Sequence, residues 1–378
     1  MAIVFIKDIS TTNLLLAYTN NVVQFNSDSV LIPTKATITI GSSVKTLYPH
    51  PGKSFYFNFK EWVTSIINTD NFKDDVNLDI DGAGYVYDWS KIYLNSDIVF
   101  AITLSDANVE TATRNTKFLS ATMQLDTYKL KYPINSSLDH PVILSPYEIA
   151  TNNTAYLKHW EGYPFDITIY TGNATTLKIS NLSNLLNYTL NVSNKVNRIA
   201  LSDGNTTATI QDALPLMDGL NSLKFTANSL DYFATLDKID EKCAGHYVKW
   251  MNDLGGFNYW LFPNGNRNRK TKDLGEINND YSNFEDTISP TIQMGKTAND
   301  VIQVASDVLT EQENLLLSGI LDSPKIYLFT GQPFAKAGVN DWMEVSISGS
   351  DYRISNAKQS QNKINITFEL PQRNTRTI

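Results

Sequence analysis

The sequence contains one cysteine and four histidines among 378 residues. A single cysteine excludes an intramolecular disulfide framework and a zinc site with four cysteine ligands. The histidines have no spacing typical of a metal site; they are His50, His140, His159 and His246. The sequence also has no P-loop, no G-x-S-x-G, no H-E-x-x-H and no G-x-G-x-x-G motif. These absences lower the expectation of an enzyme, and we predict no cofactor.

Long apolar runs and an excess of positive charge are also missing. No apolar run approaches the roughly 20 residues that a membrane-spanning helix needs, so we expect no membrane partner. The first ten residues, MAIVFIKDIS, lack a basic leader and a long apolar segment, which predicts synthesis in the cytoplasm without a secretory signal. The formal net charge of −8 is opposite in sign to that of a typical nucleic-acid-binding protein.

Strand patterns dominate the rest of the sequence. Strict alternation of apolar and polar residues predicts half-buried strands at 36–40 (ATITI), 165–170 (FDITIY), 343–347 (MEVSI) and 363–370 (KINITFEL). The run IVFAITL at 98–104 is continuously apolar, which favours a strand buried on both faces. Clusters of Gly, Pro, Asn and Asp separate these segments at short intervals, as they do in sandwiches and barrels.

Three segments show helical spacing of apolar residues. Residues 59–67 (FKEWVTSII) repeat apolar side chains at i, i+3, i+4, i+7 and i+8, with Asn58 as the expected N-cap. A longer stripe predicts a helix from about 299 to 321, which Ser323 and Pro324 would end. A weaker pattern predicts a third helix within 240–254.

Together these patterns predict a mainly β chain of serial β-sandwich or barrel-like domains, followed by a C-terminal α+β portion carrying one long helix. Length alone predicts about two or three domains. We expect a β-sandwich-like domain with one short helix at 1–133 and an Asn/Thr-rich β domain at 134–232. An α+β domain at 233–378 is the expected assembly region.

The stretch 242–262 (KCAGHYVKWMNDLGGFNYWLF) holds the only cysteine, three residues before a histidine. A thiolate nucleophile needs an adjacent base and a group that orients this base. No oxyanion-hole pattern or cysteine-protease signature surrounds Cys243 and His246, and cysteine is among the most buried residue types. Packing is therefore the favoured interpretation. We expect Trp250, Tyr259 and Trp260 to pack in the interior or at a subunit interface.

Residues 75–88 (DVNLDIDGAGYVYD) partly imitate a calcium-binding loop. Such a loop needs aspartate at its first position and a bidentate glutamate at its twelfth. Here Asn77 and Asp88 take those positions, and apolar residues alternate with the polar ones from Val76 to Ile80. A half-buried strand is therefore favoured over a metal site.

The most basic stretch is 264–272 (NGNRNRKTK). Its residues Arg267, Arg269, Lys270 and Lys272 are capable of phosphate contacts, but no aromatic residue is interleaved for base stacking. A solvated loop is the favoured interpretation. If the protein encloses a channel for DNA, we expect this loop to be the part that faces it.

Residues 159–170 (HWEGYPFDITIY) place two aromatic residues beside a carboxylate. Exposed Trp160 and Tyr163 could stack on a sugar, with Glu161 binding its hydroxyl groups. The favoured alternative is a turn at Gly162 and Pro164 that leads into a strand, with both aromatic residues packed beneath it.

Four stretches carry a resemblance to a known group of proteins: 48–68 (YPHPGKSFYFNFKEWVTSIIN), 159–170, 243–263 (CAGHYVKWMNDLGGFNYWLFP) and 315–329 (LLLSGILDSPKIYLF). In their run of aromatic residues and glycines they resemble virion proteins of crAss-like phages, which are tailed phages of Bacteroides and their relatives. Among these, the chain looks most like the proteins that build the tail barrel and hub. The resemblance spans most of the chain.

The resemblance implies a non-enzymatic structural protein of the virion tail or neck. Such a protein would form a homo-oligomeric ring below the portal, contact neighbouring tail proteins, and surround a channel that DNA passes through as cargo. It would have no catalytic residues. The alternative function is a carbohydrate-binding, fibre- or lectin-like receptor-recognition protein, which requires exposed Trp160 and Tyr163. A polysaccharide depolymerase would need a carboxylate pair, which is defined by separation in space.

Overall fold

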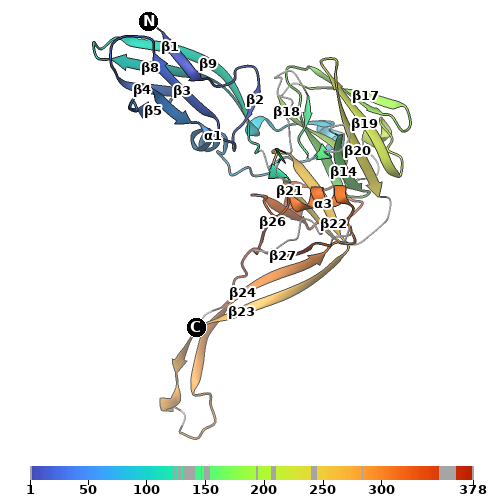
Figure 1. Ribbon diagram of the computed structural model, residues 1–378. Coiled ribbons are helices and arrows are strands. Elements are labelled where there is room, and N and C mark those ends of the chain that lie inside the picture. The colour runs from blue at the N-terminus through green and yellow to red at the C-terminus, as the bar shows by residue number, and fades with distance from the viewer. Residues whose placement is uncertain are drawn as a thin grey trace.

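The structure, a computed structural model, describes residues 2–122, 125–126, 129–130, 141–145, 147–148, 154–192, 195–205, 210–239, 245–282, 284–348 and 363–376. It is mainly β, as the sequence predicts. Figure 1 shows two β-sandwiches side by side, a third sheet beneath them, and a long two-stranded arm that extends away from the body. The short strands β10 (Leu125–Asp126) and β11 (Lys129–Leu130) pair with each other.

The first β-sandwich consists of two sheets built from the N-terminal part of the chain. The three-stranded antiparallel sheet has the order β1 (Ile3–Lys7), β3 (Val22–Ser27), β6 (Phe55–Asn58). The five-stranded sheet has the order β2 (Leu14–Leu16), β9 (Val109–Leu119), β8 (Tyr93–Leu104), β4 (Pro33–Ile40), β5 (Ser43–Leu47). Because every second residue of β4 and β8 is buried, each strand turns one face to the core, which corrects the two-sided burial expected for 98–104.

Aromatic rings fill the space between these two sheets. Phe100 of β8 lies 5.1 Å from Phe5 and 5.2 Å from Phe25, measured between ring centroids, both in edge-to-face geometry. Helix α1 (Lys60–Ile67) confirms the predicted short helix, and Phe59 at its N-cap also contacts Phe100. Asn58 is one residue too early to be the N-cap, but its Oδ1 accepts a hydrogen bond from the backbone N–H of Lys60.

The second β-sandwich also has two sheets. The four-stranded sheet has the order β12 (Val142–Ile143), β15 (Pro164–Tyr170), β18 (Val196–Asp203), β7 (Val86–Asp88). The six-stranded sheet has the order β13 (Tyr147–Glu148), β14 (Thr154–Trp160), β20 (Leu230–Ile239), β19 (Gly219–Ala227), β16 (Thr176–Asn181), β17 (Leu186–Asn191). Every residue of β15 and β18 is buried, because the third sheet covers their other face.

Residues 68–92 leave the first sandwich, contact the second and return. After α1 the chain runs without regular structure to α2 (Ile80–Ala83) and then forms β7, which pairs antiparallel with β18. A single 3-10 turn, η1 (Ser90–Ile92), then leads back into β8. The strand predicted for 75–88 is therefore wrong over most of its length. The segment lies between the two sandwiches, where the apolar residues of 76–80 face protein and the polar residues between them face solvent. Its alternation therefore arises without strand pairing, except in β7.

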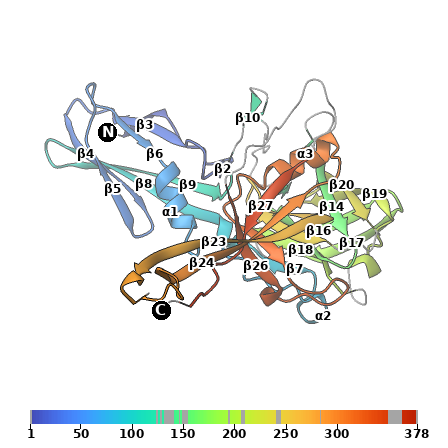
Figure 2. The same cartoon turned by 90° about the horizontal axis from the view of Figure 1, so that it is seen from below.

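The third sheet has seven strands in the order β22 (Phe257–Phe262), β21 (His246–Met251), β25 (Ile326–Phe329), β26 (Trp342–Ile347), β27 (Asn365–Glu369), β24 (Thr291–Ala305), β23 (Asn264–Asn278). Strands β23 and β24 are far longer than the others and continue beyond the sheet as the arm (Figures 1 and 2). The predicted helix within 240–254 is wrong, because residues 246–251 form the buried strand β21. Its consecutive buried residues lie alternately on the two faces of the sheet, and both faces are covered.

The predicted helix at 299–321 is also wrong in its first half. Residues 299–305 belong to β24, where Val301, Ile302 and Val304 pair with β27. The helix that exists, α3 (Glu311–Ser318), is short and begins with a capping box between Thr310 and Glu313. Adjacent β-branched residues gave the apparent helical spacing, but they also favour strands. The remaining 3-10 turns are η2 (Ile210–Asp212), η3 (Asp280–Ser282) and η4 (Val339–Asp341).

Candidate functional site

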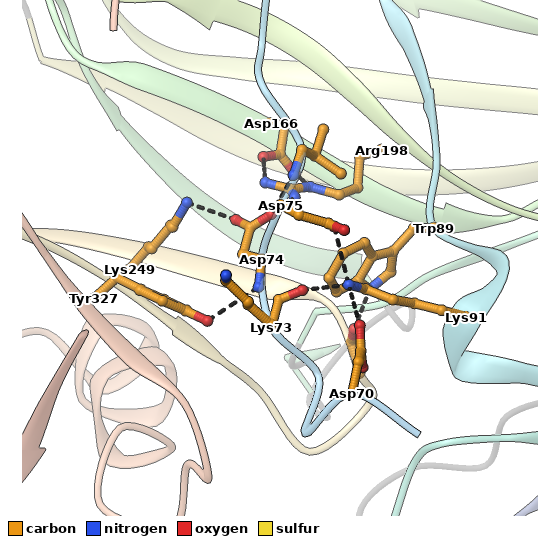
Figure 3. A network of polar contacts seen from close by, with 12 residues as sticks. Asp70, Lys73, Asp74, Asp75, Trp89, Lys91, Asp166, Arg198, Lys249 and Tyr327 are labelled. Carbon is orange, nitrogen blue, oxygen red and sulfur yellow. Dashed lines mark hydrogen bonds and ion pairs between the residues drawn. The ribbon is translucent and has the colours of Figure 1, made fainter. Parts of the chain in front are cut away.

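Four charged side chains form a buried network where the two sandwiches and the third sheet meet (Figure 3). At its centre is Asp74, on the segment that leaves the first sandwich. Its Oδ1 accepts a hydrogen bond from Nη1 of Arg198 on β18 at 2.6 Å. Its Oδ2 accepts one from Nζ of Lys249 on β21, also at 2.6 Å. One carboxylate therefore connects three separate parts of the fold.

The second carboxylate of the network is Asp166, on β15. Arg198 binds it in a bidentate manner, with Nη2–Oδ2 at 2.6 Å and Nε–Oδ1 at 3.2 Å. The hydroxyl of Tyr259, on β22, also donates to Asp166. Two carboxylates thus face two cations, and every carboxylate oxygen has a donor, as buried charges require.

Aromatic rings surround the two cations. The guanidinium of Arg198 lies 4.7 Å from the ring centroid of Phe257 and 5.1 Å from that of Trp89. The ammonium of Lys249 lies 4.0 Å from that of Trp342. Trp89 also donates from Nε1 to the carbonyl oxygen of Gly255 at 3.1 Å, which adds a neutral link between the sandwiches and the third sheet. These contacts hold the cations in place and keep water away from them.

The network holds Asp74 ionised in spite of its burial. Burial by itself would raise the pKa of Asp74, but Arg198 and Lys249 together lower it well below its ordinary value. Burial lowers the pKa of Lys249, and Asp74 counteracts this. The pKa of Arg198 is raised, because its two carboxylate partners outweigh its burial.

No substrate can reach these four charges. Their side chains are almost completely buried, and the cavity beside Lys249 and Tyr259 has a volume of about 10 Å³, room for no more than one water molecule. A catalytic carboxylate or lysine must touch its substrate. The network is therefore a structural junction that fixes how the sandwiches and the third sheet are arranged.

The arm projects away from the rest of the described chain (Figure 1). Its strands β23 and β24 have 15 residues each, which corresponds to about 50 Å of extended chain. The basic stretch 264–272 lies within strand β23, so the predicted loop is wrong. Nearly every residue of β23 is exposed to solvent. Gly275 and Gly295 face each other with positive φ where the register shifts, which is typical of a bulge.

The far end of the arm exposes several large apolar side chains. Phe284 is 93% exposed, and it has several large, exposed apolar neighbours in the arm: Leu274, Ile277, Tyr281, Ile288, Ile292 and Met294. A two-stranded hairpin is only marginally stable in water by itself, and clusters of exposed apolar residues mark interaction sites. We refer to these seven residues, including Phe284, as the arm tip.

The predicted basic residues are divided between two faces of the arm. Arg267 and Arg269 lie on one face, where both bind Asp300 of β24, at 2.6 Å and 2.8 Å. Lys270 and Lys272 alternate with them and pair with neighbours on the other face. The pKa of Asp300 is lowered by these hydrogen bonds, first from Arg269 and then from Arg267.

The other predicted residues take structural positions. Trp250, Tyr259 and Trp260 are all buried within the chain, in agreement with the packing interpretation. Cys243 lies outside the described residues. His246 begins β21, and its ring lies against Gly265 at the start of the arm, where a Cβ atom would approach it to 2.3 Å.

The sugar-stacking platform is not formed, since Trp160 is only 6% exposed and Tyr163 only 3%. The turn at Gly162, which has a φ of +83°, leads into β15 as predicted, and both aromatic rings contact Tyr247 of the third sheet. At 75–88, as elsewhere in the part of the chain that the structure describes, no three His, Cys, Asp or Glu side chains are grouped so that they could hold a metal ion. Asp79 instead caps α2 and pairs with Lys336.

His159 should give the protein a measurable pH dependence. Burial, with Lys238 nearby, lowers its pKa to about 3. The unfolded state then binds a proton that the folded state excludes, so stability is present above pH 6.5 and falls by about 1.4 kcal/mol per unit below it. His159→Gln should flatten this dependence in urea titrations between pH 7 and pH 5, whereas His50→Gln at an exposed site should not. An equally steep profile for His159→Gln would contradict the assignment.

None of the helices in the described part of the chain is long and apolar enough to span a membrane.

Comparisons with known proteins give no family for this chain. No family model matches it, and no curated protein is significantly similar. Among solved structures, domains A168–A170 of titin have 9% sequence identity and a TM-score of 0.27, and the match covers 80% of this chain and 93% of that one. A 1.5-MDa bacterial ice-binding adhesin has 10% identity and a TM-score of 0.20, with 98% and 97% covered.

A third match is to the fibronectin(III)-like modules of CbhA from Clostridium thermocellum, with 7% identity, a TM-score of 0.20, and coverage of 62% of this chain and 94% of that one. At these TM-scores the likeness supports no conclusion about fold or function. The function must therefore be inferred from the chain's own surface.

Proposed function

We propose that this chain is a non-enzymatic structural subunit that assembles into a ring through its arm. The observation that carries the proposal is the arm itself, the two-stranded hairpin that β23 and β24 form beyond the third sheet and that ends in the exposed apolar residues of the arm tip. A tip on one copy that packs on a different surface of the next copy makes a head-to-tail contact, and such contacts close into rings when their rotation allows. The buried junction supports this role, because it joins the third sheet, from which the arm extends, to the second sandwich and to the segment that leaves the first.

On the strength of the resemblance to tail barrel and hub proteins of crAss-like phages, we propose that this ring belongs to the tail or neck of a virion. The ring would contact other tail proteins and surround the channel that DNA passes through. The carbohydrate-binding alternative loses its main support, since Trp160 and Tyr163 are buried.

Removing the apolar surface of the arm tip should prevent assembly. We expect the wild-type chain to give a mass several times 42.4 kDa in light scattering, with closed rings in negative stain. The variant Tyr281→Ser/Phe284→Ser should remain monomeric at concentrations at least tenfold above those at which the wild type assembles, because it loses two aromatic side chains of the proposed contact. The monomer itself should stay folded, because both side chains are exposed in it.

The matched control is Leu185→Ser/Leu220→Ser, which removes two exposed apolar side chains from the second sandwich. This control should assemble like the wild type. A wild-type chain that stays monomeric at every concentration, or a tip variant that still forms rings, would contradict the proposed function.

A further inference from the structure

Three arginines converge on one carboxylate at the root of the arm. Besides Arg267 and Arg269 of β23, Arg373 binds Asp300 with an Nη1–Oδ2 distance of 3.3 Å. Arg373 follows β27, and its backbone N–H donates to the carbonyl oxygen of Ala298 on β24. The cluster therefore combines residues from three neighbouring strands or their extensions, and the backbone fixes their separation.

The charges of this cluster do not balance. Three guanidinium groups face one carboxylate, which leaves a net charge of +2 on a chain whose formal net charge is −8. One arginine would be enough to satisfy a buried aspartate. Asp300 is only 3% exposed, whereas the arginine side chains are 62%, 53% and 43% exposed. The carboxylate thus lies beneath the arginines, and positive charge faces the solvent.

The arginines keep donors for a ligand. Each guanidinium has five N–H groups, and each uses one of them in its hydrogen bond to Asp300. The three arginines, Asn268 and Asp300 line an open hollow on the surface of the arm. Because Asp300 holds the guanidinium groups in place, less side-chain entropy is lost when an anion binds to them.

We propose that this hollow at the root of the arm binds a phosphate group. Planar guanidinium groups match the oxygens of phosphate in bidentate geometry, and several of them around one hollow suit a tetrahedral anion better than a planar carboxylate. The phosphate comes either from a small phosphate ion or ester or from a nucleic-acid backbone. Asp300 is a positioning residue, and the arginines make the contacts. This inference goes beyond ring assembly, and its test does not require a ring.

The test compares variants of equal charge by calorimetric titration with inorganic phosphate, with pyrophosphate and with a short DNA duplex. Arg267→Gln/Arg373→Gln should weaken binding of the phosphate ligand at least tenfold. Lys270→Gln/Lys272→Gln removes the same charge from the other face of the arm and should change binding less than twofold. Arg373→Gln alone leaves Arg267 and Arg269 on Asp300 and should cause an intermediate loss, and circular dichroism melting confirms that each variant is folded.

The outcomes separate the sources of the phosphate. Binding of phosphate or pyrophosphate without binding of DNA assigns the hollow to small phosphates. Binding of DNA that inorganic phosphate displaces, and that the arginine variant loses, assigns it to a nucleic-acid backbone, with an affinity that falls as salt rises. Absence of all binding in the wild-type chain, or equal losses in the arginine and lysine variants, would overturn the proposal. Rings that form normally in the arginine variant would leave the proposed function intact.

Discussion

The variant Asp74→Asn is expected to lose about 3–5 kcal/mol of folding free energy, which is the usual result of removing one partner from a buried ion pair. The substitution leaves Arg198 and Lys249 close together without the carboxylate that both contact. Urea unfolding would measure the loss. Hydrogen exchange should locate it, with faster exchange in β18 and β21 than in the first sandwich, because the network joins the former two strands.

A neighbouring carboxylate provides the control. Asp75 is mostly exposed and pairs with Lys91 at 3.1 Å, so Asp75→Asn should cost less than about 1 kcal/mol. The pKa of Asp74 is lowered by folding, so its stabilisation is present above about pH 4 and is lost at lower pH. The difference between wild type and Asp74→Asn should therefore decrease on acidification below that pH. A loss for Asp74→Asn no larger than that for Asp75→Asn would show that the junction does not hold the parts together.

Replacing Phe100 by alanine should destabilise the first sandwich by about 3–5 kcal/mol. Phe100 is completely buried and contacts aromatic rings of β1 and β3 and Phe59, the N-cap residue of α1. Its removal leaves a cavity between two sheets that their backbones cannot close. Hydrogen exchange should show faster exchange of the amides of β8 and β9, while β15 and β18 keep their protection.

The same chemical change at the arm tip is the matched control. Phe284→Ala removes a phenylalanine with no packing in the monomer, so the free energy of unfolding should change by about 0.5 kcal/mol or less. Equal losses for both variants would mean that Phe284 is packed in solution. The measurements should use dilute, monomeric protein, so that contacts of Phe284 between subunits do not contribute to the free energy of unfolding.

The alternation of apolar and polar residues predicted many of the strands correctly. The segments 36–40, 165–170, 343–347 and 363–370 fall largely within β4, β15, β26 and β27. Alternation succeeds at β4 and β27 because a sheet with one buried face demands it. At 165–170 the strand is confirmed, but the predicted half-burial is wrong, because every residue of β15 is buried. It fails at 299–305, where the adjacent residues Val301 and Ile302 are both buried. Their spacing does not alternate, and it also fits the period of a helix.

The buried junction could not be predicted from local patterns, because its four charges come from segments far apart in the sequence. One signal was present. Asp166 and Lys249 are each an isolated charge within a largely apolar strand, Arg198 lies in a strand that is also buried throughout, and such charges need partners when the strand is buried. Their opposite signs predict that they pair, but which carboxylate pairs with which cation depends on the tertiary structure. The arm was missed for a simpler reason: its polar composition is typical of loops.

The excursion of residues 68–92 has a consequence for how the protein is made. Strand β7 leaves the ribosome before its partner β18, and at roughly 5–20 residues per second the delay is about 5–20 s. The first sandwich can close around β8 and β9 during that time, with the excursion held outside as a loop. Asp74 then remains hydrated until Arg198 and Lys249, its cationic partners, are synthesised. The order of synthesis therefore allows the first sandwich to fold before the second sandwich and the third sheet pack against the segment that leaves it.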